Sequence, residues 1–196
     1  MVRITGGQFK GRGLFVPSGD QTRPTLSKLR QALFNSLQNR IVDAKVIDLF
    51  SGSGALGFEA LSWGAAQVVF VEKSKQNVKL IQKNAKELGV GASQIFLIPE
   101  PIERAMKILD QYGPFDIVLA DPPYAEGWER KLFRLISWEN LLRDQGVFCL
   151  EWGKQKSIES PLDQPLPFLV KIREKSYGDS VLTTYLKNDG ALVKEC

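Results

Sequence analysis

Two short motifs contain the residues of this chain that are best suited to chemistry, and each begins with a carboxylate. Asp48–Gly57 (DLFSGSGALG) joins Asp48 to three glycines, and Asp121–Tyr124 (DPPY) joins Asp121 to two prolines and an aromatic ring. Each carboxylate lies at the end of an apolar run of the kind that forms a buried strand. Ligands of open α/β sheets bind beyond the carboxyl ends of the strands. The two motifs therefore predict one binding site at one edge of a sheet.

The first motif has the glycine spacing of a nucleotide-binding turn. Gly52, Gly54 and Gly57 form GxGxxG, and Glu72 stands at the end of the next apolar run. In dinucleotide-binding folds, a carboxylate at this place accepts hydrogen bonds from the ribose hydroxyls. A nicotinamide or flavin cofactor is therefore one interpretation, and a tight turn without a ligand is another.

Asp48 favours a different cofactor. A dinucleotide-binding strand runs straight into its first glycine, whereas here Leu49, Phe50 and Ser51 separate Asp48 from Gly52. A carboxylate at this position would repel a pyrophosphate but would suit a cationic ammonium group. S-adenosylmethionine has an α-ammonium group, a sulfonium and a ribose diol, and it has no phosphate. Asp48 and Glu72 therefore predict S-adenosylmethionine, although Asp48 could instead only cap the following turn.

The second motif suits an exocyclic amine. Pro122 and Pro123 fix the backbone and remove two N–H donors, so that carbonyl groups face the site. The Asp121 carboxylate and the Pro122 carbonyl can together accept the two hydrogens of an amine. This orientation opposes delocalisation of the nitrogen lone pair and directs it at an electrophilic methyl group. Tyr124 offers a flat face for stacking of the base. The alternative interpretation is a rigid polar turn.

The composition excludes several other mechanisms. The chain has no histidine, which excludes a histidine base or nucleophile and most metal sites, so we expect no metal. Methyl transfer to an amine agrees with this composition, because positioning supplies much of the rate and the proton can leave after transfer. Cys149 and Cys196 give neither a disulfide framework nor a zinc spacing. The chain has no apolar run long enough for a membrane span and no signal-peptide core, so we expect a cytoplasmic protein.

The elements that position the two motifs alternate along the chain. Apolar runs predict strands over residues 46–50, 67–72, 94–98, 115–120 and 146–151. Helical patterns separate them, over residues 55–63, 75–88 and 102–112, and residues 129–142 are mostly helical in pattern. Such alternation predicts an α/β fold with a doubly wound, mostly parallel sheet. Two last strands, over residues 168–172 and 181–186, have no helix between them and predict an antiparallel pair that completes a seven-stranded sheet.

A basic segment precedes the sheet. Residues 2–16 predict a β-hairpin, and a helix is expected to begin at Pro24-Thr25. Basic residues outnumber acidic ones strongly over positions 1–30, which hold Asp20 against Arg3, Lys10, Arg12, Arg23, Lys28 and Arg30. The whole chain, by contrast, carries a net charge of only +4. Such a segment could bind a polyanion, and the alternative is a solvated basic tail.

These motifs resemble those of the class I amino-methyltransferases, and nearly the whole chain is similar to the RsmD family of bacterial 16S rRNA guanine-N2 methyltransferases. The glycine and DPPY motifs occur in many methyltransferases. The N-terminal string ITGGQFKGRGLFVP is more specific, and TRPT, EALSWGA, FVEK and YGDS support it.

The resemblance implies a Rossmann-like class I fold and a role for each matching residue. Residues 1–40 would form an RNA-contacting extension, and residues 41–196 would form the methyltransferase domain. Asp121 and Pro122 would hold the guanine N2 amine, with Tyr124 stacked on the base. The implied cofactor-binding residues are Asp48, Phe50, Ser51, Gly52, Gly54, Glu72, Lys73 and Glu100. The implied substrate-binding residues are Arg3, Lys10, Arg12, Arg23 and Pro123.

The chain departs from the family pattern at one position. The family usually has a short Asp/Asn-Ala segment against the adenine after the third strand, whereas this chain has Pro99-Glu100-Pro101. Glu100, or the backbone alone, would then meet the adenine. The expected partner is 16S rRNA or the assembling small ribosomal subunit, and the protein is expected to be a monomer. Two rival functions stay open: methylation of adenine N6 or cytosine N4 in DNA, and RNA binding without catalysis.

Overall fold

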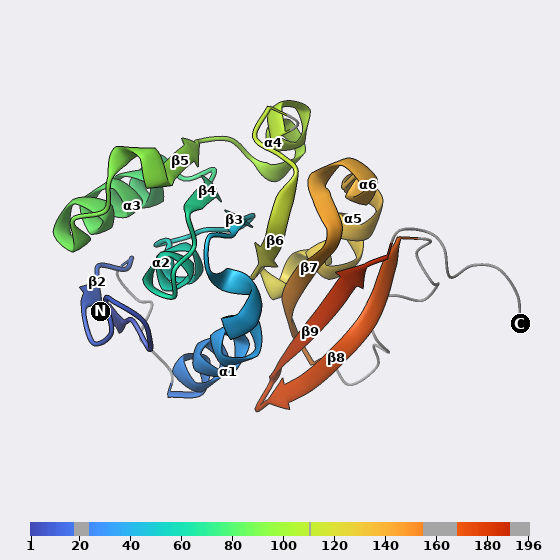
Figure 1. Cartoon of the computed structure of the whole chain (residues 1–196), viewed down its shortest axis with the longest axis horizontal. Coiled ribbons are helices and arrows are strands. Elements are labelled where there is room, and N and C mark those ends of the chain that lie inside the picture. The colour runs from blue at the N-terminus through green and yellow to red at the C-terminus, as the bar shows by residue number, and fades with distance from the viewer. Residues whose placement is uncertain (18–23, 110, 155–167, 189–196) are drawn as a thin grey trace, which may run out of the picture.

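A seven-stranded sheet forms the centre of the protein (Figure 1). The computed structural model describes residues 1–17, 24–109, 111–154 and 168–188. The strand order across the sheet is β5-β4-β3-β6-β7-β9-β8. The strands are β3 (Lys45–Asp48), β4 (Gln67–Val71), β5 (Ile95–Ile98), β6 (Phe115–Ala120), β7 (Leu142–Gly153), β8 (Leu169–Tyr177) and β9 (Ser180–Lys187).

The direction of the strands confirms the predicted fold class. The five strands from β5 to β7 pair in parallel, and β9 pairs antiparallel with both β7 and β8. The predicted antiparallel pair is therefore present at one end of the sheet. The central parallel strands β3, β4 and β6 are buried on both faces, which explains their nearly continuous apolar sequences.

Helices cover both faces of the sheet. One buried apolar cluster packs α1 (Pro24–Ile41), α2 (Ala55–Ser62) and α3 (Lys75–Leu88) against it. A second cluster packs α4 (Ile102–Leu109), α5 (Trp128–Leu135) and α6 (Trp138–Leu141) against the opposite face. No helix in the described ranges is long and apolar enough to cross a membrane.

Residues 129–142 are mostly helical, as predicted, but they form two helices with a break between them. Ile136 takes extended dihedral angles (φ −90°, ψ 128°) and ends α5, and the chain then forms the short helix α6 before it enters β7 at Leu142. The break buries Trp138, whose ring centroid lies 4.4 Å from that of Phe148 on β7. Tertiary packing of one aromatic ring therefore overrides the local helical pattern.

A small antiparallel hairpin, β1 (Val2–Arg3) with β2 (Gly13–Leu14), packs on the α2 side of the sheet (Figure 1). Each of its strands has two residues, and the segment between them docks on α2. Glu59 of α2 accepts hydrogen bonds from the backbone N–H groups of Thr5 (2.9 Å) and Gly6 (3.0 Å). Val2, Ile4 and Leu14 share the apolar cluster of α1, α2 and α3.

Candidate functional site

The two sequence motifs meet at the carboxyl ends of the parallel strands. In the register of the parallel strands, Asp48 of β3 lies opposite Phe70 of β4 and Leu119 of β6. Glu72 and Asp121 each follow these partners by two positions. The carboxyl ends of three adjacent strands therefore bring three carboxylates to the same edge, as the sequence predicts.

The glycine turn combines an open part with a tightly packed part. Gly52 (φ 54°) and Gly54 (φ 83°) both adopt left-handed backbone conformations that favour glycine. No atom lies within 4 Å of the position that a Cβ would take at Gly52, so this part of the turn has room for a ligand. A Cβ at Gly57 would lie 2.2 Å from Cε1 of the Phe70 ring. The last glycine therefore lets α2 pack closely on β4.

Asp48 is almost completely buried beneath this turn, with an exposed fraction of 1%. Its Oδ2 accepts a hydrogen bond from the backbone N–H of Gly57 at 3.2 Å, while its buried Oδ1 has no hydrogen-bond partner. Burial, and to a lesser extent the charge of Glu72, raises the pKa of Asp48 to about 7. One oxygen thus caps the turn, and the other can accept a proton or a cationic donor.

Glu72 ties the end of β4 to the glycine turn. Its Oε2 accepts from the N–H of Gly52, and its Oε1 accepts from the N–H of Ser74, both at 2.7 Å. Ser51 is also turned toward the sheet, because its hydroxyl donates to the Asp48 carbonyl at 2.8 Å and its N–H donates to the Val71 carbonyl at 3.1 Å. The turn is therefore held in shape by side chains on both sides.

The other predicted cofactor residues follow the ends of β3, β4 and β5. The ring of Phe50 packs edge-on against Trp128 at 5.3 Å, which connects the glycine turn with the segment after the DPPY motif. Lys73 is exposed beyond β4. Glu100 follows β5, the neighbour of β4, and its carboxylate forms an exposed ion pair with Arg104 at 3.7 Å.

The DPPY loop lies beyond β6 and leads into a 3₁₀ turn, η2 (Tyr124–Glu126). Asp121 and Pro123 are exposed, and Pro122 is buried. The Tyr124 hydroxyl donates to Oε1 of Glu151 at 2.8 Å and lies 3.0 Å from the Ser180 hydroxyl. Tyr124, the predicted base-stacking residue, is thus held by side chains of β7 and β9.

Four buried polar residues at or near the site were not predicted from the sequence: Glu151 at the end of β7, Ser180 at the start of β9, Asn84 on α3 and Arg30 on α1. Burial raises the pKa of Glu151. Burial also lowers the pKa of Arg30, and the charges of Glu59, Glu151 and Asp121 oppose this effect. A sequence signal existed for Glu151, since it ends an apolar strand just as Asp48 does.

Asn84 connects the N-terminal segment with the glycine turn. Its side chain is fully buried and exchanges two hydrogen bonds with the backbone of Phe15, at 2.8 and 3.0 Å. Its Nδ2 also donates to the carbonyl of Ser53 at 3.0 Å. In the sequence, the position of Asn84 on the apolar face of the predicted helix over residues 75–88 was the available signal for such a buried polar contact.

The predicted substrate-binding residues Arg3, Lys10 and Arg12 are exposed on the N-terminal hairpin. Arg3 donates to the carbonyl of Gly11 at 2.8 Å, and Arg12 donates to the carbonyl of Glu87 on α3. The hairpin is therefore a folded, basic surface on α2 and α3. Arg23 lies outside the described residues.

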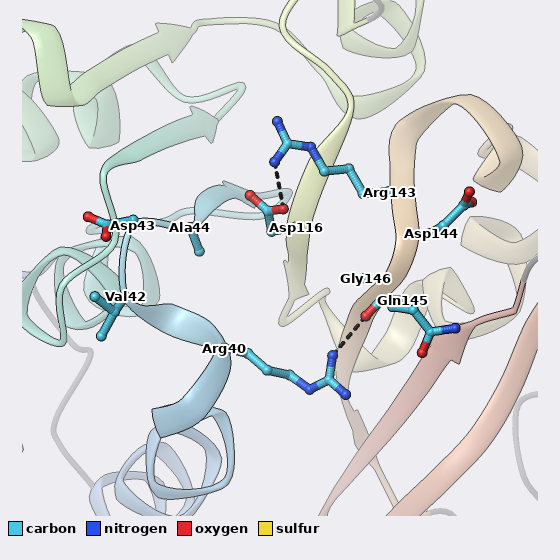
Figure 2. Close-up of a pocket in the computed structure, with 9 residues that line it drawn as sticks. All are labelled: Arg40, Val42, Asp43, Ala44, Asp116, Arg143, Asp144, Gln145 and Gly146. Atoms are coloured by element: carbon cyan, nitrogen blue, oxygen red, sulfur yellow. Dashed lines mark hydrogen bonds and ion pairs between the residues drawn. The ribbon is translucent and has the colours of Figure 1, made fainter.

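A hollow of about 260 Å³ lies at the other end of the parallel strands, beside the amino ends of β3 and β6 (Figure 2). Its charged side chains are partly paired: Arg143 donates to Asp116 at 2.8 Å, and Arg40 donates to the carbonyl of Gln145 at 2.8 Å. None of the predicted site residues lines it. Within the described ranges, no three acidic or cysteine side chains gather as a metal site would require.

The strand order and the glycine turn identify the fold as that of the class I methyltransferases, and solved structures agree. The Escherichia coli protein yhhF, whose name assigns it provisionally to the methyltransferases, superposes with a TM-score of 0.78 and 32% identity, over 95% of this chain and 98% of that one. The Haemophilus influenzae protein HI0767, whose name assigns it provisionally to the methylases, superposes with a TM-score of 0.75 and 28% identity, over 96% of this chain and 99% of that one.

Sequence comparison gives the family. The family model described as "Conserved hypothetical protein 95" matches residues 2–186. Ribosomal RNA small subunit methyltransferase D of Escherichia coli K12 is 38% identical over 76% of this chain and 74% of its own length. The Haemophilus influenzae protein of the same name is 32% identical over 90% of this chain and 89% of its own length. The chain belongs to the RsmD family.

Proposed function

We propose that this protein transfers a methyl group from S-adenosylmethionine to the exocyclic N2 amine of a guanine in 16S rRNA. The observation that carries the proposal is the position of the DPPY loop, which follows β6 directly beside the glycine turn that follows β3. A methyl donor at the turn and an amine at the loop would then face each other. The rRNA substrate is taken from the names of the closely similar relatives.

The cofactor would bind across the ends of β3, β4 and β5. The buried Oδ1 of Asp48, which has no hydrogen-bond partner, supports an ammonium group at this position. Glu72 lies one strand further along the same edge, where its carboxylate can accept from a ribose diol in addition to its present backbone donors. Glu100 lies one strand beyond Glu72, which suits the adenine end of the cofactor.

The chain's own groups would orient the acceptor amine. The Asp121 carboxylate and the Pro122 carbonyl accept its two hydrogens, so the nitrogen lone pair points at the methyl carbon. The bound cofactor would supply an electrophilic methyl group, which the amine nitrogen would take up while the cofactor leaves as a neutral thioether. The proton then leaves the methylated nitrogen, with Asp121 or water as its acceptor.

The basic hairpin suggests how the RNA is held. Residues 1–40 would form the RNA-contacting extension, in which exposed Arg3, Lys10 and Arg12 meet the phosphate backbone. A guanine in folded RNA would have to leave its stack to reach the DPPY loop. We propose a monomer that acts in the cytoplasm on 16S rRNA or on the assembling small subunit.

A labelled-methyl assay tests this function. Small subunits from a strain that lacks the gene are incubated with methyl-labelled S-adenosylmethionine and the purified protein, and the labelled nucleoside is identified by nuclease digestion and mass spectrometry. We expect N2-methylguanosine with the wild type, on the order of 100-fold less with Asp121→Ala, and no loss with Glu103→Ala, an exposed carboxylate on α4.

Other outcomes would replace the proposal. Undiminished transfer by Asp121→Ala would contradict the mechanism. A labelled adenine or cytosine would change the substrate. Tight RNA binding without any affinity for S-adenosylmethionine would indicate a binding module that does not catalyse.

A further inference from the structure

Tyr124 is held by two residues to which no role has been given. Its hydroxyl hydrogen bonds to Glu151 and lies 3.0 Å from the Ser180 hydroxyl. Since an ionised carboxylate can only accept, Tyr124 donates to Glu151, and Ser180 can donate in turn to the phenolic oxygen. Ser180 is the last residue of the YGDS string, to which the proposed mechanism gives no role.

The same face of β7 also receives the ring. Glu151 and Gly153 are two positions apart on β7, so they point to the same face. A Cβ at Gly153 would lie 2.8 Å from Cδ2 and 3.0 Å from Cγ of Tyr124. Ser180 pairs with Gly153 in the β7–β9 register, which brings all three residues together. The missing side chain of Gly153 thus leaves the space that the Tyr124 ring occupies.

This arrangement is more polar than packing alone would require. Glu151 and Ser180 are both nearly buried, with exposed fractions of 5% and 7%. A buried carboxylate is unfavourable unless it receives hydrogen bonds, and an apolar side chain would support the ring without that penalty. A hydrogen bond to a carboxylate is strong and directional, so it fixes the position of the phenol. Tyr124 as a whole stays 38% exposed, so the residue is accessible to a ligand.

We propose that Glu151, Ser180 and Gly153 form a seat that fixes the orientation of the Tyr124 ring before the substrate binds, and that Glu151 and Ser180 are positioning residues for methyl transfer. The inference rests on the proposed function, in which the base stacks on Tyr124. A ring that is already oriented would set the plane of the base, and hence the direction of the amine lone pair. A small misplacement of the reacting atoms is expected to lower the rate on the order of 100-fold.

The kinetic test distinguishes a changed orientation of the Tyr124 ring from a general loss of protein stability. In Tyr124→Phe, which keeps the ring but loses the hydroxyl, and in Glu151→Leu, we expect kcat for methyl transfer to fall about 10-fold or more, with the affinity for S-adenosylmethionine unchanged. The double variant is expected to be no worse than either single variant, because both remove the same hydrogen bond. Glu151→Gln, whose amide oxygen can still accept from Tyr124, is expected to restore most of the activity.

A second measurement does not depend on activity. The chain has four tyrosines, so ring-labelled tyrosine gives few NMR signals, and Tyr124→Phe identifies the one that belongs to Tyr124. We expect this signal to move toward that of a free tyrosine in Glu151→Leu, and to shift in Gly153→Ala, whose Cβ displaces the ring. Glu151→Gln should leave it close to the wild-type position.

The two measurements distinguish the possible failures. If the wild type transfers no methyl group but the NMR signal responds as expected, the seat is present and the proposed function is wrong. If the wild type is active but the Tyr124 signal stays unchanged in Glu151→Leu, the seat does not hold the ring. Full activity of Tyr124→Phe, or strictly additive losses in the double variant, would also overturn the proposal.

Discussion

The charged form of Asp48 is energetically unfavourable while no ligand is bound at the site. Its carboxylate is buried, one oxygen has no hydrogen-bond partner, and its pKa is raised from 3.8 to about 7. Each unit of such a shift corresponds to about 1.4 kcal/mol, so the charged form is disfavoured by on the order of 4 kcal/mol. An ammonium group beside Oδ1 would reverse this effect. When such a ligand binds, the cost of keeping this carboxylate charged and buried is reduced, and the reduction contributes to the free energy of binding.

The first prediction follows from the sign of this shift. Because the folded-state pKa is above the unfolded one, the folded protein is stabilised by this group below pH 4, and the contribution is lost as the pH rises through 7. Asp48→Asn removes the titration. Its free energy of unfolding, relative to that of the wild type, should therefore increase by about 2–3 kcal/mol between pH 5 and pH 8.

Urea unfolding of the ligand-free protein at the two pH values measures this difference. The variant should also bind S-adenosylmethionine at least about 10-fold more weakly at pH 8, because the ammonium group then faces a neutral amide instead of a carboxylate. A stability difference that does not change with pH would show that Asp48 does not titrate in this range.

The second prediction concerns Gly57. An alanine here would place its Cβ 2.2 Å from the fully buried ring of Phe70 and 2.9 Å from Cγ1 of Val68. We expect Gly57→Ala to destabilise the protein by about 1–3 kcal/mol, the usual range for overpacking a core. Gly91→Ala is the matched control, since φ there is −68° and the nearest atom lies 3.6 Å from the new Cβ. Equal midpoints of thermal unfolding for the two variants would contradict this explanation.

At the scale of elements, the order of strands and helices could be read from the sequence, but the contacts between them could not. Nearly continuous apolar runs that alternate with helical patterns predicted the parallel strands, because burial on both faces requires such sequences. The break at Ile136 depends on the place of Trp138 against β7, which only the folded chain defines. The roles of Glu59 and Asn84 depend on backbone groups of the N-terminal segment, which is distant along the chain, so no local pattern could reveal them.

The third prediction tests one of these long-range contacts. Asn84→Ala removes three hydrogen bonds that join α3 to Phe15 and to the glycine turn at Ser53. Because buried backbone groups lose their partners, we expect a loss of about 1–3 kcal/mol in the free energy of unfolding. Affinity for S-adenosylmethionine should fall as well, since the turn is less well held. Gln82→Ala, an exposed position on the same helix, is the control and should leave both quantities unchanged.

At the scale of the whole molecule, part of the basic charge of the N-terminal segment lies on one folded surface. The net charge is +4, and the excess of basic residues comes from the N-terminal segment. The hairpin that carries Arg3, Lys10 and Arg12 is packed on α2 through the buried carboxylate of Glu59. It is therefore a fixed surface, and its charges keep a defined position relative to the glycine turn.

The last prediction is that this surface, and not the net charge alone, gives the affinity for RNA. Replacement of Arg3, Lys10 and Arg12 by glutamine should weaken binding and reduce the slope of log K against log salt by up to about 0.7–0.9 for each phosphate that is no longer bound. The control replaces Arg104, Lys107 and Arg134, which are exposed on α4 and α5 across the sheet. It changes the net charge equally. Fluorescence titrations with a 16S rRNA fragment at several salt concentrations should separate the two variants, because counterions are released only where phosphates are bound. Equal slopes for both would mean that the hairpin contributes only its charge, and that the RNA lies elsewhere on the protein.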